Sequence, residues 1–138
     1  MKKLYFGHPI NAYNTELEKT LLEKIVSTFP GWDIENPNKP EHDAGYKEWH
    51  ERTGRGMNYF FEDVLPKCQG GIFLPFRDGA WGIGVFGEAE FLMKLARPAW
   101  QITAHGLISP IIRLAEIPVL SIAETRLRIR TESGIKPY

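Results

Sequence analysis

Short apolar runs alternate with longer amphipathic stretches along most of the chain. The apolar runs have the length and content of buried strands and lie at residues 2–7, 32–37, 70–76, 97–103 and 117–122. In the amphipathic stretches apolar side chains recur every three or four positions, as on one face of a helix, at residues 15–27, 57–67 and about 87–96. This order of strands and helices predicts a parallel sheet with helices on both faces.

The pattern also predicts the class of fold and the number of domains. We expect an α/β protein with a single doubly wound, mainly parallel five-stranded sheet, in the flavodoxin- or Rossmann-like manner. The 138 residues suffice for one domain with a sizeable core and are too few for two. Residues 1–138 are therefore predicted to form one domain.

Local signals mark two helix starts and one irregular region. Thr15, with Glu18 three positions on, has the pattern of a capping box and predicts that a helix begins there. Ser121 and Glu124 repeat this pattern and favour a short C-terminal helix, which we expect to be followed by a loose tail. Residues 36–56 are polar and contain several glycines and prolines, so we predict a long irregular connection with a short helix around Tyr46–Arg52 inside it.

The predicted fold also indicates where a ligand would bind. Ligands of doubly wound sheets bind beyond the carboxyl ends of the strands, near the point where the strand order reverses. Three loops that follow predicted strands should converge there, at residues 7–14, 76–87 and 103–110. Residues 104–116, which include most of the third loop, are predicted to be loop and a short helix.

Residues 82–87 (GIGVFG) match the G-x-G-x-x-G spacing of dinucleotide-binding loops. Three features argue against that function. The match lies in the third strand–helix unit, residues 77–81 separate it from the strand, and the region about 20 positions on lacks the acidic residue that such sites use. We therefore expect no cofactor, although the glycines still predict that a ligand approaches the start of a helix.

Charge and cysteine content exclude several classes of partner. The 17 basic and 17 acidic residues give a formal net charge of zero, which argues against nucleic acid or an anionic membrane as the partner. No apolar window is long enough for a transmembrane helix, and the first ten residues lack the apolar stretch of a signal peptide. We predict a cytoplasmic protein. Cys68 is the single cysteine, which rules out an internal disulfide.

Three segments, in this order, resemble the nucleoside 2-deoxyribosyltransferase-like superfamily, which includes 2-deoxynucleoside 5-phosphate N-hydrolases. The first is Tyr5-Phe6-Gly7, a tyrosine just before a glycine at the end of the first strand. The second is the apolar-proline end of the third strand, residues 72–76 (IFLPF). The third is GVFGE…LARPAWQI, which contains Glu88 at the start of a helix. The likeness covers residues 2 to about 103, with 36–56 unmatched.

This resemblance implies that the protein cleaves the N-glycosidic bond of a deoxynucleoside or its monophosphate. In the family, a glutamate attacks the anomeric carbon and forms a glycosyl ester, which water or a second base resolves. Glu88 falls on this nucleophile, and Tyr5 falls on the tyrosine that holds it in position. The family also has an aspartate on the helix before the third strand. Counting back reaches Phe61, so we assign this role to Asp63, with Glu62 as second choice.

Other residues near the expected ligand are candidates for substrate binding. The loop after the first strand should approach the sugar or its phosphate, Arg77 could hold a phosphate, and Trp81 could stack on a base. A plain turn, a surface charge and core packing would explain the same residues without a ligand. The candidates are Gly7, His8, Pro9, Asn11, Glu62, Arg77, Trp81, Gly82, Gly84, His105 and Ser109.

Glu88 and Glu90 also have an explanation that involves no chemistry. Acidic residues in the first turn of a helix stabilise it through the helix dipole, and a helix that begins near residue 87 would place both there. The two lie roughly 200° apart around a helix, so only one can face a pocket. We expect Glu90 to be a surface or capping charge. The histidines and acids of residues 41–50 match no standard set of metal ligands, and we expect no metal.

The favoured hypothesis is an N-hydrolase whose substrate is a nucleoside or nucleoside 5-monophosphate. A base-exchanging deoxyribosyltransferase is one alternative, and a non-catalytic nucleotide-binding module of the same fold is the other. Because members of the superfamily pair as dimers, the resemblance also implies a homodimer or a higher homo-oligomer.

Overall fold

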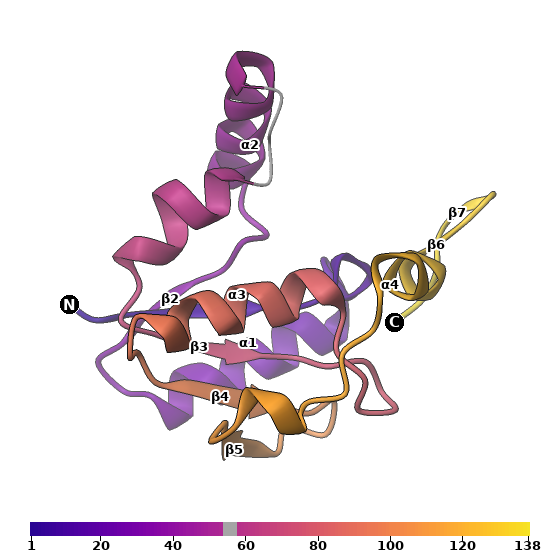
Figure 1. The fold of residues 1–138 in the computed structure, drawn as a ribbon. Coiled ribbons are helices and arrows are strands. Elements are labelled where there is room, and N and C mark those ends of the chain that lie inside the picture. The colour runs from indigo at the N-terminus through magenta and orange to yellow at the C-terminus, as the bar shows by residue number, and fades with distance from the viewer. Residues whose placement is uncertain (54–57) are drawn as a thin grey trace.

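A computed structural model describes residues 1–53 and 58–138 (Figure 1). At its centre lies a five-stranded sheet of order β2-β1-β3-β4-β5, in which β1 to β4 are parallel and β5 is antiparallel to β4. The strands are β1 (Lys3–Gly7), β2 (Asp33–Glu35), β3 (Gly70–Phe73), β4 (Ala99–Ile102) and β5 (Ile108–Pro110). The predicted class, a mainly parallel five-stranded α/β sheet, is confirmed.

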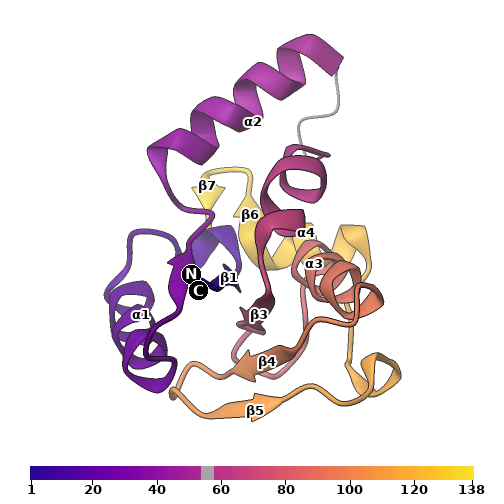
Figure 2. The same ribbon diagram turned by 90° about the vertical axis from the view of Figure 1, so that its left-hand side faces the viewer.

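Helix α1 (Glu16–Thr28) covers one face of the sheet and α3 (Ile83–Lys94) covers the other (Figure 2). The remaining α-helices are α2 (Pro40–Thr53) and α4 (Ile122–Ile129). On β1, Leu4 and Phe6 belong to the core on the α1 side, together with Leu21. Tyr5 belongs to the core on the α3 side, together with Leu92. The alternation of side chains along a strand therefore directs Tyr5 towards α3.

The strand order reverses between β1 and β3, because β1 pairs with β2 on one side and with β3 on the other. At the carboxyl ends of these strands Gly7 is in register with Phe73, and the amide of Leu74 donates to the carbonyl of Gly7 at 2.9 Å. The predicted loops 7–14 and 76–87 thus start beside each other, at the position where ligands of this fold class bind.

Residues 40–53 and 58–67 form a helical arm that projects from the sheet (Figures 1 and 2). After α2, the chain winds through a π-helix at Phe60–Val64 and a 3-10 helix at Leu65–Lys67. A helix was predicted over 57–67. Its described part, residues 58–67, is helical, although most of its turns are of the π and 3-10 types.

The short helix predicted around Tyr46–Arg52 is present, but the irregular connection predicted around it is wrong for the described part of 36–56, which is mostly the longer helix α2. Polar side chains lie around most of this helix, so it lacks the apolar stripe that marks a helix in a sequence. Signals at its ends favour it instead. Pro40 is the first helical residue, Glu41 and Asp43 lie in the first turn, and Arg52 lies in the last.

Helix α3 begins earlier than the predicted start near Gly87. It starts at Ile83, with Gly82 as its N-cap, so Gly84 and Gly87 are interior positions of the helix. Because glycine has a low helix propensity, the glycines of this segment led us to predict a later start of the helix. The glycines of residues 82–87 consequently do not form a tight turn between a strand and a helix.

The strand predicted at 117–122 is wrong, since that segment contributes only a bridge between Val119 and Trp81. The fifth strand is β5, within the segment 104–116 that we predicted to be loop and a short helix. A tight turn with Gly106 at φ +82° lets β5 fold back on β4 and occupy this edge of the sheet.

The C-terminal residues have regular structure, and the last of them contacts the loop after β3. The predicted cap of α4 is confirmed, because Ser121 and Glu124 form both hydrogen bonds of a capping box. The predicted loose tail is wrong. Strands β6 (Arg130–Thr131) and β7 (Gly134–Ile135) form a hairpin, and the Tyr138 hydroxyl donates to the carbonyl of Pro75.

Candidate active site at the carboxyl ends of the strands

Tyr5 and Glu88 meet between β1 and α3, close to the carboxyl end of β1. The Tyr5 hydroxyl donates to Oε2 of Glu88, and the two residues are 1% and 9% exposed. Gly7 makes room for this carboxyl group. A Cβ at Gly7 would lie 3.2 Å from Oε1 of Glu88 and 2.5 Å from Cδ1 of Phe73. The sequence resemblance therefore selected a pair of residues, Tyr5 and Glu88, that are in direct contact.

Burial controls the proton affinity of this pair. Burial raises the pKa of Glu88 to about 8, against an opposing effect of the hydrogen bond from Tyr5. Burial and the nearby Glu88 carboxylate raise the pKa of Tyr5 well above its ordinary value, and the same two causes raise the pKa of Tyr13. At neutral pH, Glu88 is mostly a protonated carboxyl group that can donate a proton. At higher pH it becomes a carboxylate that can attack an electrophile.

The helix-capping explanation fails for both glutamates. The first turn of α3, a fully described helix, holds no acidic residue, because the helix begins five positions before Glu88. Glu90 instead pairs with Lys94 at 3.6 Å, and its side chain is 41% exposed. Glu90 is thus the surface charge that we predicted, whereas helix capping does not explain the burial of Glu88.

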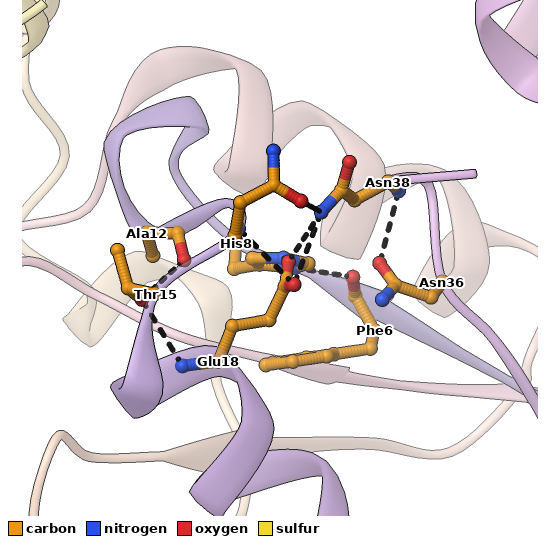
Figure 3. Close-up of polar contacts among 8 residues, drawn as sticks. Phe6, His8, Ala12, Thr15, Glu18, Asn36 and Asn38 are labelled. Carbon is orange, nitrogen blue, oxygen red and sulfur yellow. Dashed lines mark hydrogen bonds and ion pairs between the residues drawn. The ribbon is translucent and has the colours of Figure 1, made fainter. Parts of the chain in front are cut away.

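His8 belongs to a buried polar network on the α1 side of the sheet (Figure 3). Its Nδ1 lies 2.9 Å from the carbonyl oxygen of Phe6, and its Nε2 lies 2.7 Å from Oε2 of Glu18. Nδ2 of Asn38 donates to both carboxylate oxygens of Glu18 and to Oδ1 of Asn14, each at 3.0 Å. This network ties β1 and α1 to the segment that leads into the arm.

Sequence analysis missed this role of Glu18. The predicted capping box is half formed, because the Thr15 hydroxyl accepts from the Glu18 amide at 3.2 Å while the Glu18 carboxylate turns towards His8. Burial disfavours ionisation of Glu18, but hydrogen bonds from His8 and Asn38 outweigh it and lower its pKa. The spacing of Thr15 and Glu18 matched a capping box, a common pattern, and so gave no indication that Glu18 binds His8.

Helix α4 lies against the start of α3 and the loop after β1. The amide of Ile83 donates to Oγ1 of Thr125 at 3.0 Å, so α4 satisfies one free amide at the start of α3. Nδ2 of Asn11 donates to the carbonyl of Arg128 at 3.2 Å, whereas its buried Oδ1 lacks a hydrogen-bond partner among the described residues. Hydrogen bonds thus fix α4 both to the start of α3 and to the loop after β1.

Several predicted binding residues lie in the loops after β1 and β3 and at the start of α3, with differing exposure. Pro9 and Gly82 are buried, and a Cβ at Gly82 would lie 3.3 Å from Cγ2 of Thr125. Gly84 is exposed on the first turn of α3. Arg77 is exposed, donates from Nε to the carbonyl of Tyr138 at 3.1 Å, and places its guanidinium 4.8 Å from the centre of that ring.

Other predicted residues lie elsewhere or serve the core. Asp63 pairs with Lys67 at 3.3 Å on the arm, and Glu62 is exposed. Trp81 is 1% exposed and donates from Nε1 to Oε1 of Gln101 at 3.1 Å, so its ring is part of the core. His105 and Ser109 are exposed, in the turn before β5 and on β5 itself.

The described residues were also compared with the requirements of a metal site and of a membrane-spanning helix. Within residues 1–53 and 58–138, no group of three or more His, Cys, Asp or Glu side chains is placed to hold a metal ion. None of the helices in the same ranges has the length and apolar character needed to cross a membrane.

Comparison with known proteins gives no match to a family model, to a curated protein or to a solved structure. The function must therefore be argued from the chemistry of the buried Tyr5–Glu88 pair and its surroundings.

Proposed function

We propose that the protein cleaves the N-glycosidic bond of a nucleoside or nucleoside 5-monophosphate, with Glu88 as the nucleophile. The proposal includes membership of the nucleoside 2-deoxyribosyltransferase-like superfamily. One observation carries it: Tyr5 donates a hydrogen bond to a buried Glu88 between β1 and α3, beside the point where the strand order reverses. A buried carboxyl group with a strongly raised pKa is characteristic of functional sites.

In the proposed reaction, the ionised Glu88 carboxylate attacks the anomeric carbon. The carbon–nitrogen bond breaks, its electron pair leaves with the base, and the base takes up a proton. Water then hydrolyses the glycosyl ester and regenerates the carboxylate. The Tyr5 hydroxyl stabilises the carboxylate through its hydrogen bond, and Gly7 leaves the carboxyl group free of a neighbouring side chain. Because the nucleophile must be ionised, the rate should rise with pH through about 8.

A screen of nucleosides and their 5-monophosphates, with free base measured by chromatography, tests the proposal. Glu88→Gln should lose turnover by orders of magnitude. Glu90→Gln is the matched control, because it changes a partly exposed carboxylate of the same helix. A 2-deoxy-2-fluoro nucleoside should slow hydrolysis of the ester, so that intact mass and peptide mapping locate the sugar on Glu88.

The outcomes separate the alternatives. Transfer of the sugar to an added second base would make the protein a deoxyribosyltransferase that uses the same nucleophile. Binding of nucleotides without turnover would identify a nucleotide-binding module, an alternative favoured by the pairing of Asp63 with Lys67 on the arm. Equal release of base by the wild type and Glu88→Gln would contradict the role of Glu88.

The resemblance also leads us to propose a homodimer or higher homo-oligomer. Sedimentation velocity over a range of protein concentrations would measure the association state, and a monomer at every concentration would refute it.

A further inference from the structure

A second chain of acid–base side chains lies at the base of the arm, where α2 meets the sheet. Oε1 of Glu35 on β2 is 2.5 Å from Nε2 of His42 on α2. Nδ1 of the same ring is 2.9 Å from the hydroxyl of Tyr59, which lies on the second half of the arm. His42 is 6% exposed and Tyr59 is 8% exposed. Three separate segments therefore converge on one buried imidazole.

The geometry admits the proton arrangement of a catalytic triad. When Glu35 is a carboxylate it only accepts, so Nε2 of His42 donates to it, and Nδ1 of a neutral ring then accepts from the Tyr59 hydroxyl. Lys39 lies 3.7 Å from the other carboxylate oxygen of Glu35 and supplies a positive charge. This is the order of roles in carboxylate–imidazole–hydroxyl triads, which are identified by geometry and not by sequence position. The imidazole can take the phenolic proton while the carboxylate stabilises the resulting imidazolium.

A cavity of about 210 Å³ adjoins these three side chains. Its other lining residues are Lys3, Glu41, Asp63, Val64 and Lys67. The volume restricts a ligand to a small molecule, since pockets for drug-sized ligands start at roughly 300 Å³. Lys3 and Lys67 line the cavity together with the acidic residues Glu35, Glu41 and Asp63. The two lysines are the cavity's candidates for stabilising negative charge that develops on a reacting oxygen.

Gly45 allows this arrangement. A Cβ at this position of α2 would lie 2.5 Å from Cζ and 2.7 Å from the hydroxyl oxygen of Tyr59. Only a residue without a side chain lets α2 approach the phenol so closely. The helix therefore accommodates the reactive end of the Tyr59 ring, despite the low helix propensity of glycine.

We propose that Tyr59 is the nucleophile of a second reactive site, independent of Glu88, that accepts an acyl group from a small activated ester. The Tyr59 oxygen attacks the carbonyl carbon, and its proton passes to Nδ1 of His42. The bond to the leaving oxygen then breaks, and that oxygen takes the proton from His42. Water, deprotonated by His42, hydrolyses the acyl-tyrosine to a carboxylic acid and restores the phenol.

Base assistance is needed because the phenol does not ionise readily by itself. Burial raises the pKa of Tyr59, and the carboxylates of Asp63, Glu35 and Glu41 add to this effect. The reactivity of Tyr59 should therefore depend on His42 and should not reflect a population of free phenolate. This dependence distinguishes a triad from an ordinary surface tyrosine.

Tyr46 provides a matched internal control. It lies on the same arm and its ring stacks with that of His50, with ring centres 6.3 Å apart and an angle of 4° between the planes. Unlike Tyr59, it does not line the described cavity. The comparison is therefore between Tyr46, whose ring stacks on a histidine, and Tyr59, whose hydroxyl is hydrogen-bonded to a histidine.

The experiment treats the full chain with phenylmethanesulfonyl fluoride, an acyl-type probe that leaves a stable ester. The Tyr59 oxygen bonds to sulfur, fluoride leaves, and the phenolic proton is lost through His42. Peptide mapping should show labelling of Tyr59 at least about tenfold ahead of Tyr46. Release of nitrophenolate from 4-nitrophenyl acetate should slow by about a hundredfold or more in Tyr59→Phe and His42→Asn, and stay unchanged in Tyr46→Phe.

Equal labelling of the two tyrosines in the wild type would overturn the proposal, and so would undiminished nitrophenolate release by His42→Asn. Circular dichroism verifies the fold of each variant, and the wild-type labelling ratio decides the question alone if His42→Asn does not fold. Because these probes contain no nucleoside, the result is independent of whether the protein releases a base.

Discussion

The buried carboxyl group of Glu88 should make stability depend on pH in a way that one substitution removes. Its pKa is about 8 in the folded chain, against 4.5 for an ordinary glutamate. Between these values the folded chain keeps a proton that the unfolded chain releases, so the free energy of unfolding falls as pH rises from 4.5 to 8 and then levels off. Each pH unit in this window costs about 1.4 kcal/mol, which gives about 3 kcal/mol at pH 7 and about 5 kcal/mol above pH 8.

Glu88→Gln tests this reasoning directly. The glutamine does not ionise, and its amide oxygen can still accept the hydrogen bond from Tyr5. At pH 5 the variant and the wild type should differ in unfolding free energy by less than about 1 kcal/mol, whereas at pH 8 the variant should be more stable by about 3–5 kcal/mol. Urea denaturation at pH 5, 6.5 and 8, followed by circular dichroism, measures the difference.

The control for this prediction is Glu90→Gln, which removes a partly exposed carboxylate from the same helix. Its unfolding free energy should follow that of the wild type at all three pH values. If Glu88→Gln also runs parallel to the wild type, the carboxyl group is ionised throughout and the argument from burial is wrong. If the variant gains stability at high pH and loses turnover, the wild type sacrifices stability for function at this residue.

Three further predictions concern packing, capping and the network on the α1 side. Gly7→Ala should lower the unfolding free energy by about 1–3 kcal/mol in thermal melts, because its Cβ would overlap Phe73; an unchanged midpoint would contradict this packing. Thr125→Val should cost about 1 kcal/mol and speed hydrogen exchange in the first turn of α3; unchanged exchange would show that α4 does not cap α3. The lowered pKa of Glu18 stabilises the fold above pH 4.5, and this contribution is lost as pH falls. Glu18→Gln should therefore flatten the acid limb of the stability curve, and an unchanged limb would refute the role of the network.

Most of the sheet could be predicted from the sequence because its strands have strong local signals. The predicted runs at 2–7, 70–76 and 97–103 contain β1, β3 and β4. These strands are apolar, and the segments between them have the spacing of helices or the residues of turns. The run at 32–37 also contains the edge strand β2, but the strand at the opposite edge, beside β4, was predicted wrongly. Whether Ile108–Pro110 or residues 117–122 pairs with β4 depends on which segment reaches that edge, and periodicity does not report this.

In the candidate site, too, features with a local sequence signal could be predicted, and contacts between distant segments could not. Contact between Tyr5 and Glu88 follows from a strand and a helix that pack in consecutive layers, and the resemblance had singled out both residues. The contact between Thr125 and the start of α3 joins segments 42 positions apart and has no local signal. The position of Asp63 on the arm could not be predicted. A helix with polar side chains on most sides lacks the apolar stripe that would mark it in a sequence.

The two edge strands determine how this protein meets other β-structure. Strand β2 has three residues, Asp33–Glu35, with a charge at each end, and β5 has three residues that finish at Pro110. Short edges that carry charge or proline are poor templates for a strand from another molecule. Aggregation of this protein should therefore start from unfolded chains, so its shelf life at high concentration should follow the rate of unfolding rather than the frequency of collisions between native molecules.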